Sequence, residues 1–197
     1  MSLILASASA SRAAMLRAAG LDFDIVPVRV DEEEIKLALK ADGAGVRDAA
    51  TALAELKAHR VSHGATQDFV IAADSMLDCG GRWYDKPADM EAARQQLQSL
   101  RGKTHDLVSA VVLARGGSVI WRHVESAKLT MRDFSDGFLD AYLAQAGDAV
   151  LHSVGCYQLE GLGVQLFSRI QGDFFSILGL PLLPLLAILR ENKVLRS

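Results

Sequence analysis

The stretch FVIAADSMLD, Phe69 to Asp78, decides the fold class of this chain. Its first five residues, Phe69 to Ala73, are uncharged and largely apolar, and they lead directly into Asp74 and the hydroxyl group of Ser75. A short apolar run that has β-branched residues and no polar alternation is typical of a strand buried on both faces. The sequence therefore predicts an α/β protein in which Asp74 lies at the end of an interior strand.

Asp74 has two readings. Burying a carboxylate costs free energy unless another group uses or compensates its charge. Ligands of open α/β sheets gather at the ends of strands, so Asp74 is a candidate for chemistry. The alternative is that Asp74 only caps the turn that follows it. This stretch alone does not separate the two readings.

Size and composition exclude several functional classes. The chain has 197 residues, a net charge of −3 and a pI of about 5.9, so it lacks the basic footprint of a protein that binds duplex nucleic acid. Two cysteines, Cys79 and Cys156, make neither a metal-ligand spacing nor a disulfide framework. The most apolar tract, Ile177 to Leu189, is too short to span a bilayer and contains two prolines. We expect one compact cytoplasmic domain over residues 1–197, with no membrane partner.

The N-terminal segment combines small hydroxyl residues with an arginine. Leu3 to Ala6 predicts a first strand, and Ala13 to Ala19 follows a helical pattern. Between them lie residues 7–12, SASASR, which place backbone N–H groups and hydroxyl groups at a helix N-terminus. This arrangement favours an anion such as phosphate, and Arg12 suits phosphate because guanidinium binds its oxygens bidentately. The alternative is a simple serine N-cap with a solvated arginine.

Three further places in the chain carry charged residues that could belong to a site. Asp31 to Glu34 is a run of four acids, which normally forms a solvated helix start, although one member could point inward as a metal ligand or base. Lys57 lies on a predicted helix, Arg47 to His63, where a lysine is normally exposed. Lys86 precedes Pro87, which biases its backbone toward an extended conformation and fixes it in a loop.

The remaining chain predicts strands, helices and a glycine-rich segment. Short strands joined by glycine turns predict a mixed sheet. The expected strands also include residues 23–30, 107–113, 118–125, 127–131 and 167–170, and the expected helices include residues 89–100 and 136–146. The glycines of residues 153–163 allow the backbone to approach a ligand or another chain segment closely.

Taken together and in order, these motifs identify the chain as similar to the Maf family of nucleoside triphosphate pyrophosphatases over nearly its full length. The motifs that carry the resemblance are LASASASR (5–12), Asp31-Glu32, LAELKA with Lys57, IAADS with Asp74, YDKP with Lys86, LRGKTHDLVSAV (100–111), VGCYQLEGLG (154–163) and GDFFSILGLPLLPL (172–185). The resemblance implies a mixed central sheet flanked by helices, with two lobes around a cleft. It also implies hydrolysis between the α- and β-phosphates of a nucleoside triphosphate, and commonly a homodimer.

The resemblance further implies roles for individual residues. Asp74 would be the general base for the attacking water, and Glu32 together with Asp74 would hold Mg²⁺ or Mn²⁺. Positive charge around the phosphates would come from Arg12, Lys57 and Lys86, with phosphate donors from Ser7 and Ser9. Positioned cations and an activated water are what phosphoryl transfer requires.

Three positions depart from the commonest family pattern and bear on the choice of base. Ser11 replaces an arginine, Ser75 replaces a threonine, and Glu160 replaces the glutamine of the pyrimidine-preferring branch. A carboxylate accepts hydrogen bonds only, so Glu160 favours a base edge that donates, such as that of guanine. We therefore expect guanine-type substrates, such as 7-methyl-GTP, over dTTP and UTP. The alternative function is a nucleotide-binding regulatory protein linked to septum formation, but such a protein would not require the full catalytic set.

Overall fold

The computed structural model describes residues 2–196, and these form two compact units. Unit 1 consists of the residues up to Ser75, Ser109–Glu125 and the residues from Gly179 onward. Unit 2 consists of Met76–Val108 and Ser126–Leu178. The two units agree with the expectation of two lobes, whereas the cleft between them stays a prediction.

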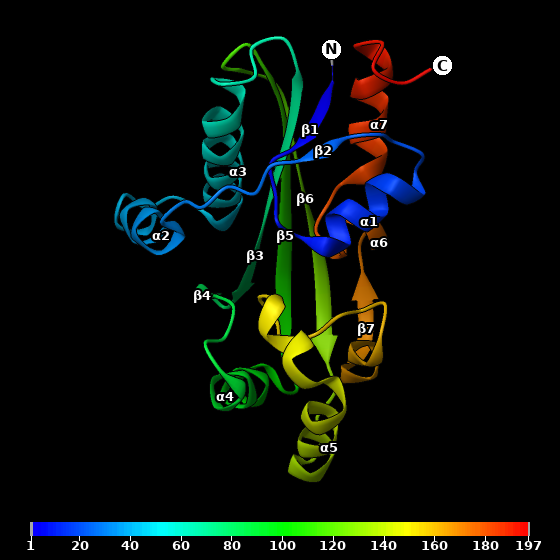
Figure 1. Cartoon of the computed structure of the whole chain (residues 1–197). Helices are drawn as coiled ribbons and strands as arrows, with labels where there is room; N and C mark the ends of the chain where they lie inside the picture. The colour runs from blue at the N-terminus through cyan, green and yellow to red at the C-terminus, as the bar shows by residue number, and fades with distance from the viewer. Residues whose placement is uncertain (1, 197) are drawn as a thin grey trace. The chain divides into compact units, whose positions relative to one another are not determined.

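Seven strands form one mixed sheet with the order β2-β1-β3-β5-β6-β7, and β4 pairs with β3 off this path. Strand β1 pairs in parallel with β2 and β3, whereas β3–β4 and β6–β7 are antiparallel. The strands are β1 (Leu3–Leu5), β2 (Asp24–Ile25), β3 (Phe69–Cys79), β4 (Arg82–Tyr84), β5 (Thr104–Arg115), β6 (Ser118–Met131) and β7 (Phe167–Gln171) (Figure 1). The sheet confirms the predicted mixed α/β class.

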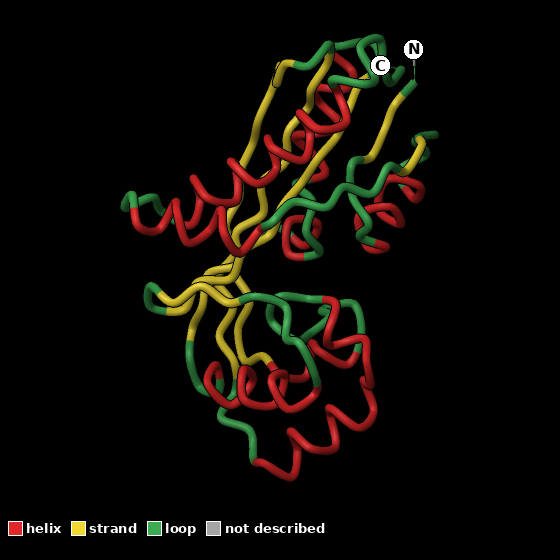
Figure 2. Tube along the Cα trace, turned by 60° about the vertical axis from the view of Figure 1, so that its left-hand side comes forward, coloured by secondary structure: helices red, strands yellow, loops and turns green. Residues whose placement is uncertain are grey.

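Helices flank the strands in both units (Figure 2). Among the described residues, five begin at a side-chain cap that accepts a backbone N–H: α1 at Ser9, α2 at Asp31, α4 at Asp89, α5 at Ser135 and α6 at Asp173. Such caps satisfy donors that have no partner within the helix. The helices are α1 (Ala10–Ala18), α2 (Glu32–Ala41), α3 (Val46–Ser62), α4 (Met90–Leu100), α5 (Asp136–Ala146), α6 (Phe174–Ile177) and α7 (Leu182–Glu191).

Three strand predictions were wrong in their extent. The strand expected to end at Asp74 continues to Cys79, so Asp74 lies within β3 and not at its end. The strand expected at residues 23–30 is only Asp24–Ile25, because Pro27 has no N–H with which to continue the ladder. The strands expected at residues 118–125 and 127–131 are one continuous strand, β6. The predicted turn before β6 is confirmed, and Gly116 and Gly117 take the positive φ angles of 59° and 78° that a tight hairpin turn requires.

The core of unit 2 includes the glycine-rich segment, and there the glycines serve the packing of the chain against itself. A Cβ atom added at Gly155 would lie 2.1 Å from Cε1 of Tyr157, and one added at Gly163 would lie 2.6 Å from the carbonyl oxygen of Gln158. Tyr157 itself is buried in this core and packs edge-on against Phe167. These close approaches lie within the glycine-rich segment itself, whereas its approach to a ligand stays a prediction.

Candidate active site

Strand β3 carries Asp74 into the interior of unit 1. Residues Phe69 to Ala73 are almost fully buried, and β3 lies between β1 and β5 in the sheet. This position explains the uninterrupted apolar run, because both faces of the strand are covered. Asp74 retains only 4% of its accessible surface. A capping aspartate on a surface turn would be exposed, so this burial favours the chemical reading of Asp74.

Lys57 joins Asp74 to Glu32. Its Nζ atom donates to Oδ1 of Asp74 at 2.6 Å and lies 2.6 Å from Oε1 of Glu32. Lys57 lies on the inner face of α3 and is 8% exposed, so the reading of an ordinary surface lysine does not hold. A lysine is rarely buried unless its charge is paired, and here two carboxylates share one ammonium group. Of the acidic run, Glu32 is thus the member that points inward.

A second buried lysine, Lys36, extends this chain of charges, and the sequence analysis did not identify it. Its Nζ atom lies 3.6 Å from Oε2 of Glu32, one turn earlier on α2, and Lys36 as a whole is 8% exposed. The i,i+4 spacing of an acid and a lysine was the available signal. An acid and a lysine at that spacing usually form a solvent-exposed ion pair, so the spacing did not indicate that Lys36 is buried.

The electrostatic surroundings of Asp74 suit a base. Burial raises the pKa of its carboxyl group above the ordinary value, the nearby charge of Glu32 adds to this effect, and the ammonium of Lys57 opposes it. The second carboxylate oxygen, Oδ2, is buried and has no hydrogen-bond partner among the described residues. An acceptor left in this way is available to a water molecule or a metal ion.

The predicted phosphate turn adopts a compact local structure at the N-terminus of α1. The hydroxyl oxygen of Ser9 accepts the N–H of Arg12 at 3.4 Å, which is the N-cap bond. The hydroxyl oxygen of Ser7 accepts the N–H of Ser9 at 3.2 Å and a guanidinium N–H of Arg12 at 3.3 Å. Both alternatives of the sequence analysis are therefore partly realised: Ser9 is a cap, and the turn still gathers donors at a helix start.

Arg12 is held by the protein through four hydrogen bonds. Its Nε donates to the carbonyl oxygen of Gly179 at 2.8 Å, and Nη1 donates to the carbonyl oxygen of Ala73 at 2.9 Å as well as to Ser7. Its Nη2 donates to the hydroxyl oxygen of Ser75 at 3.0 Å. The reading of a solvated arginine is excluded by these contacts. A bidentate contact with phosphate would require the guanidinium group to exchange some of these partners.

The remaining predicted residues are distributed over both units. Ser11 is half-buried on α1 in unit 1, and Ser75 exchanges a hydrogen bond of 2.9 Å with the buried hydroxyl of Ser109. Lys86 and Glu160 belong to unit 2, where both are exposed and lie outside its helices and strands. Unit 1 thus brings together Ser7, Ser9, Arg12, Glu32, Lys57, Asp74 and Ser75.

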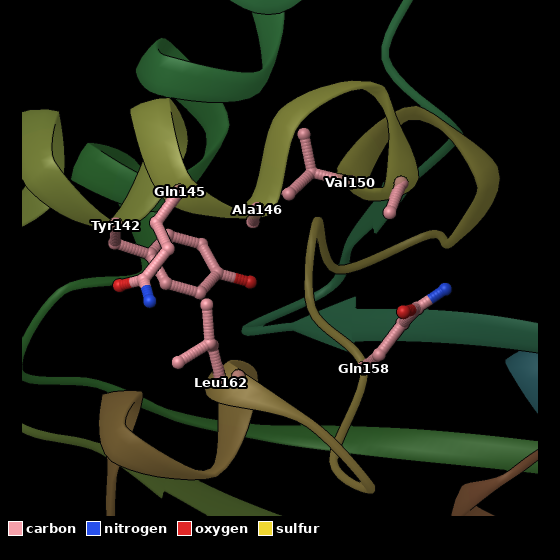
Figure 3. Close-up of a pocket in the computed structure, with 8 residues that line it drawn as sticks. Tyr142, Gln145, Ala146, Val150, Gln158 and Leu162 are labelled. Carbon is pink, nitrogen blue, oxygen red and sulfur yellow. The ribbon is translucent and has the colours of Figure 1, made fainter.

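Unit 2 also contains a pocket of about 210 Å³ beside α5 (Figure 3). The amide side chains of Gln145 and Gln158 lie at its border, together with Tyr142, whose hydroxyl donates to the carbonyl oxygen of Cys156 at 2.9 Å. None of the predicted catalytic residues lines it. We therefore keep the charged cluster of unit 1 as the candidate active site.

The charged cluster of unit 1 has two carboxylates, Asp74 and Glu32, that could take part in binding a divalent metal ion. Within residues 2–196 there is no group of three or more His, Cys, Asp and Glu side chains that could hold a metal ion by itself. Mg²⁺, however, is commonly bound by one or two carboxylates together with phosphate oxygens of the substrate. The partnerless Oδ2 of Asp74 and the neighbouring carboxylate of Glu32 fit that kind of site. Across the same residues, no helix is both long and apolar enough to cross a bilayer.

Comparison with known proteins gives consistent matches along the whole chain. The family model described as Maf-like protein matches residues 2–192. A nucleoside triphosphate pyrophosphatase of Granulibacter bethesdensis is 54% identical over 195 residues, which cover 99% of both chains. A nucleoside triphosphate pyrophosphatase of Paramagnetospirillum magneticum is 57% identical and covers 96% of this chain and 97% of its own. A 7-methyl-GTP pyrophosphatase of Rhizobium meliloti is 51% identical, with 96% and 95% covered.

Proposed function

The chain belongs to the family of Maf-like proteins, and we propose that it is a nucleoside triphosphate pyrophosphatase of the house-cleaning type. The observation that carries this proposal is the buried carboxylate of Asp74, which is bound on one oxygen by Lys57 and has no partner on the other. The relatives named nucleoside triphosphate pyrophosphatase share more than half of their residues with this chain over nearly its full length. A pure binding module would not require such a buried base.

The proposed reaction is an attack of water on the α-phosphorus atom. A bond forms between the water oxygen and phosphorus, and the bond from phosphorus to the α,β-bridging oxygen breaks. The nucleoside monophosphate and pyrophosphate are released. Asp74 takes the proton of the water through Oδ2, and the raised pKa of its carboxyl group makes it a better base than a surface aspartate. Lys57 holds the other oxygen of Asp74 and so fixes the direction of Oδ2.

The predicted cations and hydrogen-bond donors fit a highly charged substrate. Lys57 in unit 1 and Lys86 in unit 2 are assigned to the negative charge of the phosphates, and the hydroxyl groups of Ser7 and Ser9 lie at the helix start of the predicted phosphate turn. Glu32 and Asp74 would hold a divalent ion, Mg²⁺ or Mn²⁺, which when bound would neutralise charge on the phosphate oxygens. A chelator should therefore abolish pyrophosphate release, and added Mg²⁺ or Mn²⁺ should restore it.

We assign the base preference to guanine-type nucleotides, including 7-methyl-GTP. Glu160, an acceptor-only side chain that is exposed in unit 2, supports this assignment, and so does the relative named 7-methyl-GTP pyrophosphatase at 51% identity. Ser11 and Ser75 are the other two positions assigned to base selection. A cytoplasmic location and a homodimer remain predictions.

The experiment is a comparison of pyrophosphate release from 7-methyl-GTP, GTP, dTTP and UTP by the purified full-length chain. We expect release from the guanine nucleotides at the highest kcat/KM, and Glu160→Gln should reduce this preference by about tenfold, the cost of one mismatched polar contact. Gln158→Glu is the matched control, because Gln158 is also exposed in the same segment. No release from any triphosphate would contradict the proposed function. A preference for dTTP and UTP would contradict only the base assignment.

A further inference from the structure

We propose that Arg12 is a positioning residue that fixes the Asp74 carboxylate, and that substrate phosphate is bound by other groups. This inference rests on the proposed pyrophosphatase function. The guanidinium group of arginine has five N–H donors. Four of them are bonded to protein acceptors in unit 1, at distances between 2.8 and 3.3 Å. A single N–H on Nη2 is left, which is too few for a bidentate contact with phosphate.

The acceptors of Arg12 lie on both sides of Asp74 along β3. The carbonyl group of Ala73, which accepts at 2.9 Å, belongs to the peptide bond that joins Ala73 to Asp74. The hydroxyl group of Ser75, which accepts at 3.0 Å, belongs to the next residue. Arg12 therefore holds the backbone immediately before Asp74 and the side chain immediately after it, so the starting point of the Asp74 side chain is fixed from both sides.

Two further segments complete this arrangement. The Nε atom of Arg12 donates to the carbonyl oxygen of Gly179 at 2.8 Å and so connects Arg12 to the turn before α7. The hydrogen bond from Nη1 of Arg12 to Ser7 connects it to the turn before α1. Gly179 has a φ of +100°, and a Cβ atom there would lie 3.2 Å from Oγ of Ser75 and 3.5 Å from Nε of Arg12. A residue with a side chain would be strained in that conformation and would crowd the hydroxyl group. On the other side, the fully buried Ser109 holds the hydroxyl of Ser75.

The chemistry explains why this position requires arginine. Its planar group presents donors in a rigid fork that can serve acceptors from several directions at once, whereas lysine offers a point charge on a flexible stem. If Arg12 bound substrate phosphate, a lysine at this position would retain much of the function, since lysine is a common phosphate binder. A positioning role predicts that lysine fails almost as badly as a neutral residue. The two roles are therefore separated by Arg12→Lys and Arg12→Met.

The experiment compares these variants with Arg17→Met as the matched control. Arg17 is an exposed arginine on the same helix, where it lies over the ring of Phe23. We measure kcat and KM for 7-methyl-GTP and GTP, the Kd of guanosine 5′-(α,β-methylene)triphosphate by calorimetry, and hydrogen exchange of peptides that cover residues 70–78. The control should match the wild type in all four quantities.

The positioning role predicts a loss in kcat of about 100-fold in both Arg12→Lys and Arg12→Met, the effect of a displacement of about 1 Å at a reacting group. The Kd of the analogue should stay within about threefold, and exchange of the amides near Asp74 should rise severalfold because this part of β3 opens more easily without the bonds of Arg12 to Ala73 and Ser75. A rise in Kd of about 30-fold in Arg12→Met that Arg12→Lys reverses would overturn the inference. Unchanged exchange would overturn it as well.

The inference can still be tested if the Arg12 variants do not fold or if the wild-type chain is inactive. If the Arg12 variants do not fold, Ser75→Ala removes one acceptor and leaves the charge in place, and it should lower kcat about tenfold and raise the hydrogen exchange of the amides near Asp74. Wild-type kcat in Ser75→Ala would then overturn the inference. If the wild-type chain releases no pyrophosphate from any triphosphate, the proposed function fails, and hydrogen exchange near Asp74 still decides whether Arg12 positions it.

Discussion

Removal of the ammonium group of Lys57 should destabilise the folded protein and not only inactivate it. In Lys57→Met, the Asp74 carboxylate, at 4% exposure, loses its hydrogen-bond donor, and Glu32 loses an ion-pair partner that lies at 2.6 Å. Removing one partner of a buried ion pair typically costs about 3–5 kcal/mol. We expect a loss of about 3 kcal/mol at pH 7, because the Glu32 side chain is 41% exposed and can be hydrated.

The assay for this prediction is urea unfolding followed by circular dichroism. Lys40→Met, a substitution of an exposed lysine on α2, is the control and should change the free energy of unfolding by less than about 0.5 kcal/mol. The double variant Lys57→Met/Asp74→Asn should recover at least about 1 kcal/mol relative to Lys57→Met, because Asn is neutral. A loss in Lys57→Met no larger than that of the control would refute the reasoning about the buried pair.

Two further predictions concern pH. His105 is 1% exposed, its Nδ1 has no partner among the described residues, and burial lowers its pKa to about 4. The unfolded chain therefore binds a proton that the folded chain does not, so the free energy of unfolding should fall by up to about 3 kcal/mol as the pH drops from about 6.5 to 4. In His105→Phe this part of the pH dependence should vanish in urea titrations at several pH values, and its persistence would contradict the assignment to His105. For catalysis, the raised pKa of Asp74 means that kcat should fall on acidification through a pKa above 3.8. Lys57→Met should move this limb upward, since Lys57 is the largest influence that lowers the pKa. An acid limb at or below pH 3.8 in the wild type would oppose the role of Asp74 as base.

Those features of the candidate site that depend on a few neighbouring residues could be predicted from the sequence. The apolar run before Asp74 predicted an interior strand, and the hydroxyl-rich turn predicted a capped helix start, because strand burial and N-caps are encoded over a few neighbouring residues. The strand boundaries predicted for residues 23–30 and 118–131 were less accurate. Pro27 prevents the ladder of β2 from continuing, and β6 runs without a break from Ser118 to Met131.

Other features depend on contacts that no local pattern contains. Helical periodicity does not reveal that Lys57 faces a carboxylate 17 positions later, and it gives Lys36 the appearance of a surface residue. The bond between Arg12 and Gly179 joins residues 167 positions apart. The sequence therefore indicated that Arg12 matters but assigned its donors to phosphate, whereas the fold supplies four acceptors within the protein.

The central claim is that the buried carboxylate of Asp74 is the base that activates water for pyrophosphate release. The most direct test is a measurement of pyrophosphate release from 7-methyl-GTP and GTP by Asp74→Asn, together with nucleotide binding and circular dichroism. The account predicts that kcat falls by about 10³-fold or more, within the range that a general base contributes, whereas the fold and nucleotide binding are largely retained. Near-wild-type turnover in a folded Asp74→Asn variant would contradict it.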